Sequence, residues 1–180
     1  IPSVASYKVL QQQEQLDGTY TTVETENLSG TIGNSVTPAV KSYTGFTSPS
    51  TQTVTISADG STTVTYKYVR TNYTVTYKDV VDNTSGTVLK ETTASKKYGS
   101  SVRGTDIGSS TADNAYYNGY YYVSDTSATV GTSGATVYRI FKLRTINITG
   151  TVNWIDNSNK WSTRPNNVTI YLYRDGENIN

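Results

Sequence analysis

The chain has 180 residues, of which 34% are hydrophobic and 16% charged, and its formal net charge is +1. This length allows one or two ordinary domains, and the near-neutral charge argues against nucleic acid or an anionic membrane surface as a partner. No apolar run is long enough to span a bilayer. The sequence contains no Cys, His or Met, which excludes thiolate chemistry and removes the commonest general base.

Thr, Ser, Asn and Gly are abundant, and 16 residues are Tyr. Thr and Tyr favour strands because a branched or aromatic side chain packs well on a half-buried pleated surface. Polar and apolar residues alternate over residues 64–68, 73–77 and 168–173, a pattern that predicts half-buried antiparallel strands. A single helical turn is predicted over residues 36–42. The sequence therefore predicts a mainly β fold.

An internal repeat becomes visible when the two halves are compared. Tyr7 and Tyr73 each open a strand-like segment, and Gly33 and Gly99 each follow 26 positions later (33 − 7 and 99 − 73). An aromatic-x-Gly-aromatic element then occurs in both halves, at residues 43–46 and 117–120. The second copy carries an insertion of about eight residues. Two tandem copies of one small β module are the simplest explanation, with a junction at residues 70–72.

A different composition begins at Ile146. Residues 146–154 are predicted to form a strand that ends on Trp154, and a polar loop leads to the 168–173 strand. Two strands do not make an independent domain in water. The chain is therefore expected to be an excised piece that stops inside a third module.

The two halves resemble known repeat families. Residues 16–20 (LDGTY), 23–30 (VETENLSG) and 57–61 (SADGS) make residues 1–70 similar to internalin B-repeat modules of Gram-positive surface proteins. Residues 71–145 resemble mucin-binding-protein (MucBP) repeats. Both resemblances imply small β-grasp-like modules, each with a mixed sheet and little or no helix.

The tail resembles a third family. Residues 153–157 (NWIDN), Arg164-Pro165 and residues 168–173 (VTIYLY) make residues 146–180 similar to the start of a Cna protein B-type domain, a β-sandwich that forms stalk repeats and often carries a Lys–Asn isopeptide cross-link. The position of the reactive Lys is Val152 here, so no such bond is expected in the tail. Lys8, Lys78 and Lys90 lie on predicted strands of the two repeats, and no local pattern selects one of them for a cross-link.

The sharpest functional feature is the tyrosine cluster at residues 116–122. Flat aromatic faces bind sugar rings, and neighbouring amides bind hydroxyl groups, so Tyr117, Asn118, Tyr120 and Tyr121 are the candidate ligand-binding residues. The alternative is that alternate tyrosines fill the core, since Tyr120 and Tyr121 would take opposite faces of a strand.

No catalytic, metal or cofactor site is expected. The carboxylates show no paired arrangement for glycoside hydrolysis and are predicted to be solvated surface charges; they are Glu14, Glu24, Glu26, Asp79, Asp82 and Glu91. Asp156, Asn157 and Asn159 come nearest to a calcium loop, but no bidentate Glu follows them.

These features, together with the resemblances, favour a non-enzymatic, extracellular repeat region of a bacterial surface protein, anchored to the cell wall through other parts of its parent. It would act as a stalk that contributes to adhesion, and as a monomer when excised. The alternative function is an adhesive module that binds host mucin or another extracellular glycan or protein through the tyrosine cluster.

Overall fold

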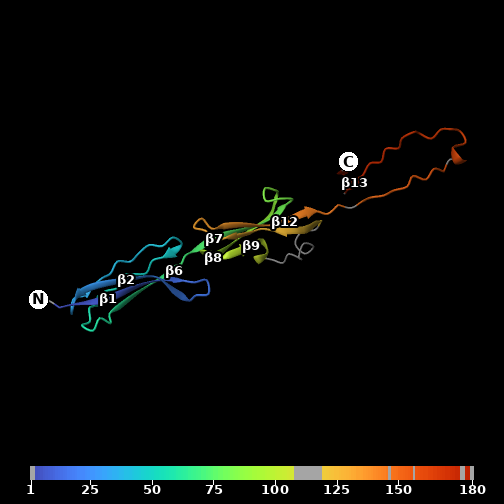
Figure 1. The fold of residues 1–180 in the computed structure, drawn as a ribbon. Coiled ribbons are helices and arrows are strands. Elements are labelled where there is room, and N and C mark those ends of the chain that lie inside the picture. Colours follow the sequence, from blue (N-terminus) through green and yellow to red (C-terminus); the bar gives the residue numbers. More distant parts are fainter. Residues whose placement is uncertain (1–2, 108–118, 146, 156, 175–176, 179–180) are drawn as a thin grey trace. The chain divides into compact units, whose positions relative to one another are not determined.

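The computed structural model describes residues 3–107, 119–145, 147–155, 157–174 and 177–178 (Figure 1). The chain divides into two compact units, residues 1–144 and 145–180. Strands dominate, and the helical segments in the described ranges are two short 3₁₀ turns, η1 (Gly104–Asp106) and η2 (Asn157–Asn159). The predicted mainly β fold is confirmed. Within these ranges no helix is long and apolar enough to cross a membrane.

The first half of unit 1 is a mixed four-stranded sheet. Its order is β2 (Tyr20–Thr31), β1 (Val4–Glu14), β6 (Thr63–Arg70) and β4 (Phe46–Thr47). β1 runs antiparallel to β2 and parallel to β6, and β4 runs antiparallel to β6. A separate antiparallel ladder joins β3 (Ser35–Val36) to β5 (Val54–Thr55).

The second half of unit 1 has the same topology (Figure 1). Its sheet has the order β8 (Val88–Lys97), β7 (Asn72–Val81), β12 (Ala135–Leu143) and β10 (Tyr120–Asp125). β7 is antiparallel to β8 and parallel to β12, and β10 is antiparallel to β12. β9 (Ser101–Arg103) pairs with β11 (Ser127–Thr129). Both halves therefore combine a mixed sheet with a separate two-stranded ladder.

The alternating residues 64–68 and 73–77 were predicted to form antiparallel strands, and this is wrong for one neighbour of each; the sheets are mixed, as the family resemblances imply. β1 and β6 are parallel, as are β7 and β12. Alternation of polar and apolar residues reports that one face of a strand is buried, and it does so equally for both strand directions. A parallel pair also needs a long crossover, which the segments between β2 and β6 and between β8 and β12 supply.

Each sheet buries one face in its own core. The first core contains Tyr7, Val9, Ile56, Val64, Tyr66 and Tyr68. The second contains Val75, Tyr77, Val102, Val130 and Val137. In both cases the buried residues of the sheet alternate with exposed or partly exposed Thr and Lys, as expected for strands with one face towards solvent.

The segment that crosses the first core is irregular and has no helical residue, so the helical turn predicted over residues 36–42 is wrong. Two core tyrosines satisfy its backbone instead. The Tyr66 hydroxyl donates to the Pro38 carbonyl at 2.7 Å and accepts from the Gln52 amide at 3.2 Å. The Tyr68 hydroxyl accepts from the Lys41 amide at 2.8 Å. Because these partners come from the sheet, the segment needs no helical hydrogen bonds to satisfy these groups.

Unit 2 contains little regular structure. Ile146 lies outside the described residues, and the strands predicted over the rest of 146–154 and over 168–173 are wrong except at Tyr173. The ladder found there joins β13 (Tyr173–Arg174) to β14 (Glu177–Asn178). Large apolar side chains remain exposed, with Ile155 at 102% and Trp161 at 74%. Alternating residues form a stable strand only where other strands and a second layer complete the sheet, and the described part of unit 2 supplies neither to these segments.

Candidate functional site

The tyrosine cluster lies only partly within the described residues. Tyr117 and Asn118 fall outside them, whereas Tyr120 and Tyr121 begin β10. Tyr121 is 38% exposed, and Tyr120 is half-buried. Tyr122 packs edge-to-face on Phe141 of the core side, with ring centroids 6.0 Å apart. Tyr121 and Tyr122 therefore lie on opposite faces of the strand, and the sugar-facing candidate among the described residues is Tyr121.

Arg144 donates two hydrogen bonds to the backbone at this end of β10. Its amide donates to the Gly119 carbonyl at 2.6 Å, and its Nε donates to the Tyr120 carbonyl at 3.0 Å. The guanidinium lies 5.9 Å from the centre of the Tyr121 ring, within the range of a cation–π contact. This end of the sheet thus offers one exposed aromatic ring beside one positive charge.

The other end of β10 holds an acidic group in a fixed position. Asp125 accepts two hydrogen bonds from the Arg103 guanidinium, at 2.9 and 3.2 Å. It also accepts from the Thr105 hydroxyl at 2.8 Å and the Tyr122 hydroxyl at 3.3 Å. The Arg103 bond, followed by those of Thr105, lowers the pKa of Asp125 to about 2. Asp125 is therefore a structural anion and a poor proton donor or acceptor at neutral pH.

Asp79 and Arg139 form a buried ion pair inside the second sheet. Arg139 Nε and Nη2 each donate to a different Asp79 carboxylate oxygen at 2.7 Å. The Asp79 side chain is 8% exposed and the Arg139 side chain 3%. Asp79 was predicted to be a solvated surface charge, and this prediction is wrong. Its strand is central, and a buried carboxylate there is tolerated because neighbouring strands supply cations.

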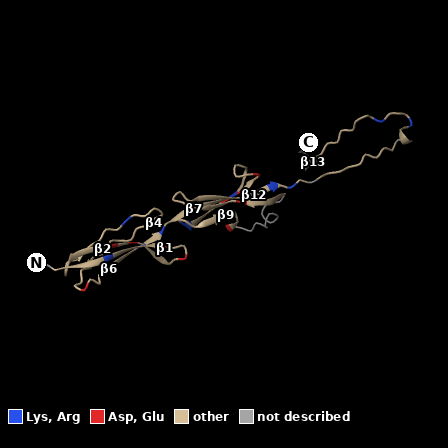
Figure 2. Ribbon diagram, viewed as in Figure 1, with Lys and Arg blue, Asp and Glu red and all other residues tan. Residues whose placement is uncertain are grey.

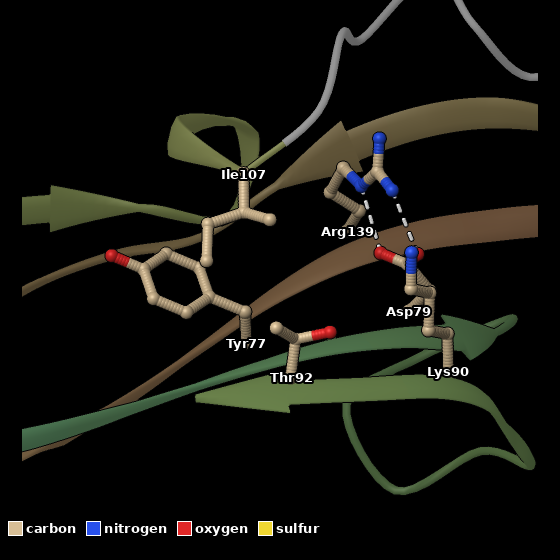
Figure 3. Close-up of a pocket in the computed structure, with 6 residues that line it drawn as sticks. All are labelled: Tyr77, Asp79, Lys90, Thr92, Ile107 and Arg139. Carbon is tan, nitrogen blue, oxygen red and sulfur yellow. Dashed lines mark hydrogen bonds and ion pairs between the residues drawn. The ribbon is translucent and has the colours of Figure 1, made fainter. Parts of the chain in front are cut away.

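A small hollow lies beside this ion pair (Figure 3). It is lined by Tyr77, Asp79, Lys90, Thr92, Ile107 and Arg139, and its volume is about 10 Å³. That is close to the minimum for one water molecule and far too small for a sugar ring. Figure 3 shows the Tyr77 hydroxyl pointing away from the ion pair. Among the described residues this hydroxyl has no hydrogen-bond partner.

The junction of the two sheets is a second polar site within the described part of unit 1. β6 ends at Arg70 and β7 begins at Asn72, so Thr71 is the whole connection. Arg70 Nε donates to the Glu14 carbonyl, and Arg70 Nη1 donates to the Tyr98 carbonyl, both at 2.8 Å. One guanidinium therefore bonds to both sheets at the point where the chain crosses between them.

Glu14 is the second polar residue of this junction, and it corrects the prediction of a solvated carboxylate. It is only 7% exposed. Its carboxylate accepts from Lys97 Nζ at 2.6 Å and from the Arg70 amide at 2.8 Å. These two bonds, the Lys97 bond first, lower the pKa of Glu14. Sequence reasoning missed the site because its members are 56 and 83 residues apart.

Charged side chains are otherwise dispersed over the described strands (Figure 2). Within those ranges no three acidic residues come together in a group that could hold a metal ion. Of the calcium-loop residues considered above, Asp156 lies outside the described ranges, and Asn157 and Asn159 belong to η2.

Comparison with known proteins gives one family match. Residues 148–180 match the family of the Cna protein B-type domain. No curated protein is significantly similar to the chain. The internalin B-repeat resemblance of residues 1–70 and the MucBP resemblance of residues 71–145 stay predictions.

Two solved structures are similar to larger parts of the chain. The Bacillus anthracis TIE protein has 14% sequence identity and a TM-score of 0.44, over 78% of this chain and 34% of that one. Domains 3–4 of a cell surface protein with Streptococcal High Identity Repeats in Tandem (SHIRT) have 15% identity and a TM-score of 0.30, over 77% of this chain and 98% of that one. The chain thus spans about a third of the TIE chain that it matches.

Proposed function

We propose that this chain is a non-catalytic, extracellular repeat region of a bacterial surface protein and that it acts as a spacer. The observation that carries the proposal is the direct joining of two sheets of identical topology through Thr71. A spacer has to keep consecutive modules at a fixed distance, and a one-residue connection with hydrogen bonds on both sides leaves little freedom for rotation. The Cna protein B-type match of residues 148–180 supports a surface location.

The chemistry of the described residues fits a role without catalysis. The buried acidic groups, Glu14 and Asp79, are fully engaged by Lys or Arg. The hollow beside Asp79 has room for about one water molecule. An enzyme would need titratable groups that converge on a substrate-sized cleft.

Spin-label distance measurements test the spacer role. The sequence has no Cys, so Thr25→Cys in β2 and Thr93→Cys in β8, both exposed, give one label in each sheet of the full chain. A rigid spacer gives a single narrow distance distribution. A broad distribution, typical of modules on a flexible linker, would refute the proposal.

A second candidate function is adhesion to mucin or another extracellular glycan. The observation that favours it is the exposed Tyr121 ring beside the Arg144 guanidinium. Glycan-array binding by the full chain should be lost in Tyr121→Ala and kept in Tyr20→Ala. Tyr20 is a matched control because Lys67 lies 5.0 Å from its ring centre in the first sheet. Failure of the unaltered chain to bind, or equal loss in both variants, would exclude this site.

A further inference from the structure

We propose that Tyr98, the residue after β8 of the second sheet, is a latch that docks against Gly45, Phe46 and Arg70 of the first, and that through it the two sheets unfold as one cooperative unit. This inference goes beyond the spacer role. It concerns the folding of residues 1–144 and holds whether or not the chain separates other modules.

The side chain of Tyr98 occupies a position that only glycine leaves open. A Cβ placed on Gly45 would lie 2.2 Å from the Tyr98 ring, and the φ angle of Gly45 is +82°. The Tyr98 ring packs edge-on against Phe46, with centroids 6.2 Å apart. The Arg70 guanidinium lies 5.1 Å from the Phe46 ring centre. The Tyr98 ring therefore packs against Gly45 and Phe46 of the first sheet, and Arg70 stacks on the same Phe46 ring.

The backbone of Tyr98 is bonded to the same place. Its amide donates to the Thr71 carbonyl at 2.8 Å, and the Thr71 amide donates to the Gly45 carbonyl at 2.9 Å. Its carbonyl accepts from Arg70 Nη1 at 2.8 Å. Tyr98 follows directly on β8, whose last residue, Lys97, bonds to Glu14. Unfolding of either sheet would therefore leave polar groups of the other sheet without these partners. The free-energy cost of these unsatisfied groups couples the unfolding of one sheet to that of the other.

The latch is specific to the junction between the two repeats. Gly33 corresponds to Gly99, but the residue before it is Ile32, so the first repeat has no tyrosine to dock in this way. Gly119 corresponds to Gly45 and has a similar φ angle of +88°, yet no atom of the described residues lies within 4 Å of the position of its Cβ. Gly119 therefore provides a control with the same backbone strain and no docked ring.

Hydrogen exchange read by mass spectrometry over a urea series tests the proposal on the full chain. Peptides from β1 and β7 should share one urea midpoint in the unaltered protein. In Gly45→Ala the two midpoints should separate by about 0.5 M or more. In Gly119→Ala the strain of alanine at positive φ should lower both midpoints together.

Tyr98→Ala removes the ring without creating a steric overlap, so it can replace Gly45→Ala as the test if that variant does not fold. It should also separate the urea midpoints of β1 and β7. Separate midpoints in the unaltered protein would overturn the proposal. So would coincident midpoints in Tyr98→Ala, or a separation in Gly119→Ala as large as that in Gly45→Ala.

Discussion

Replacing Arg139 by Met tests whether the second sheet depends on its buried ion pair. The change keeps an unbranched side chain but leaves the Asp79 carboxylate, 8% exposed, without two hydrogen bonds of 2.7 Å. Breaking a buried pair on one side typically costs about 3–5 kcal/mol. Lys90 is the cross-strand neighbour of Asp79 and lines the same small hollow (Figure 3), so a second positive charge remains on this part of the sheet. We therefore expect a loss near the lower end, about 3 kcal/mol.

The double variant Asp79→Leu/Arg139→Met separates the pair from its surroundings. With neither charge left alone in the interior, it should be more stable than the single Arg139→Met by about 1–2 kcal/mol. Urea unfolding of the full chain followed by far-ultraviolet circular dichroism measures both free energies, and an unchanged slope shows that the comparison is valid. The single variant Asp79→Leu completes the comparison. If the double variant loses as much free energy of unfolding as Asp79→Leu and Arg139→Met lose together, the ion pair is not what stabilises the sheet.

Three further predictions follow from single hydrogen-bonding groups. Asp125, with its pKa lowered from 3.8 to about 2, adds stability that is present above pH 4 and lost as the pH falls towards 2. The free energy of unfolding should therefore fall by about 1–2 kcal/mol over this pH range in the unaltered protein, and by less in Asp125→Asn. Tyr68→Phe removes the hydroxyl that accepts from Lys41 and donates to Gln11 and should cost about 1–3 kcal/mol in urea unfolding. Tyr77→Phe removes a hydroxyl with no partner among the described residues and should be neutral or stabilising in the same assay.

Local patterns predicted the strands because each strand carries its own signal. Val75 and Tyr77 are buried while Thr74 is exposed and Thr76 partly exposed, as alternation requires. The matched glycines of the repeat adopt positive φ angles in both copies, +80° at Gly33 and +79° at Gly99. Such angles are a property of the individual turn, so a residue type suffices to indicate them.

Contacts between distant residues could not be predicted in this way. Glu14 has the sequence context of a surface residue, and it is buried because Arg70 and Lys97 reach it from other strands. The irregular segment over the first core depends likewise on the hydroxyls of Tyr66 and Tyr68, which are 28 and 27 residues away from their partners. The same holds for the candidate sugar-binding site. Alternation predicted that Tyr121 lies on the face opposite Tyr122, but it could not indicate that the distant residue Arg144 lies beside Tyr121.

The parallel pairing of β1 with β6 has a mechanical consequence. The chain enters the first sheet at Val4 and leaves it after Arg70, so tension applied along the polypeptide pulls these two neighbouring strands in opposite directions along their length. The hydrogen bonds over the register from Lys8–Thr63 to Gln13–Tyr68 then carry the load together and must break at nearly the same moment. A hairpin pulled from its open end would release them one after another. β7 and β12 repeat the arrangement, so both sheets are built to resist stretching.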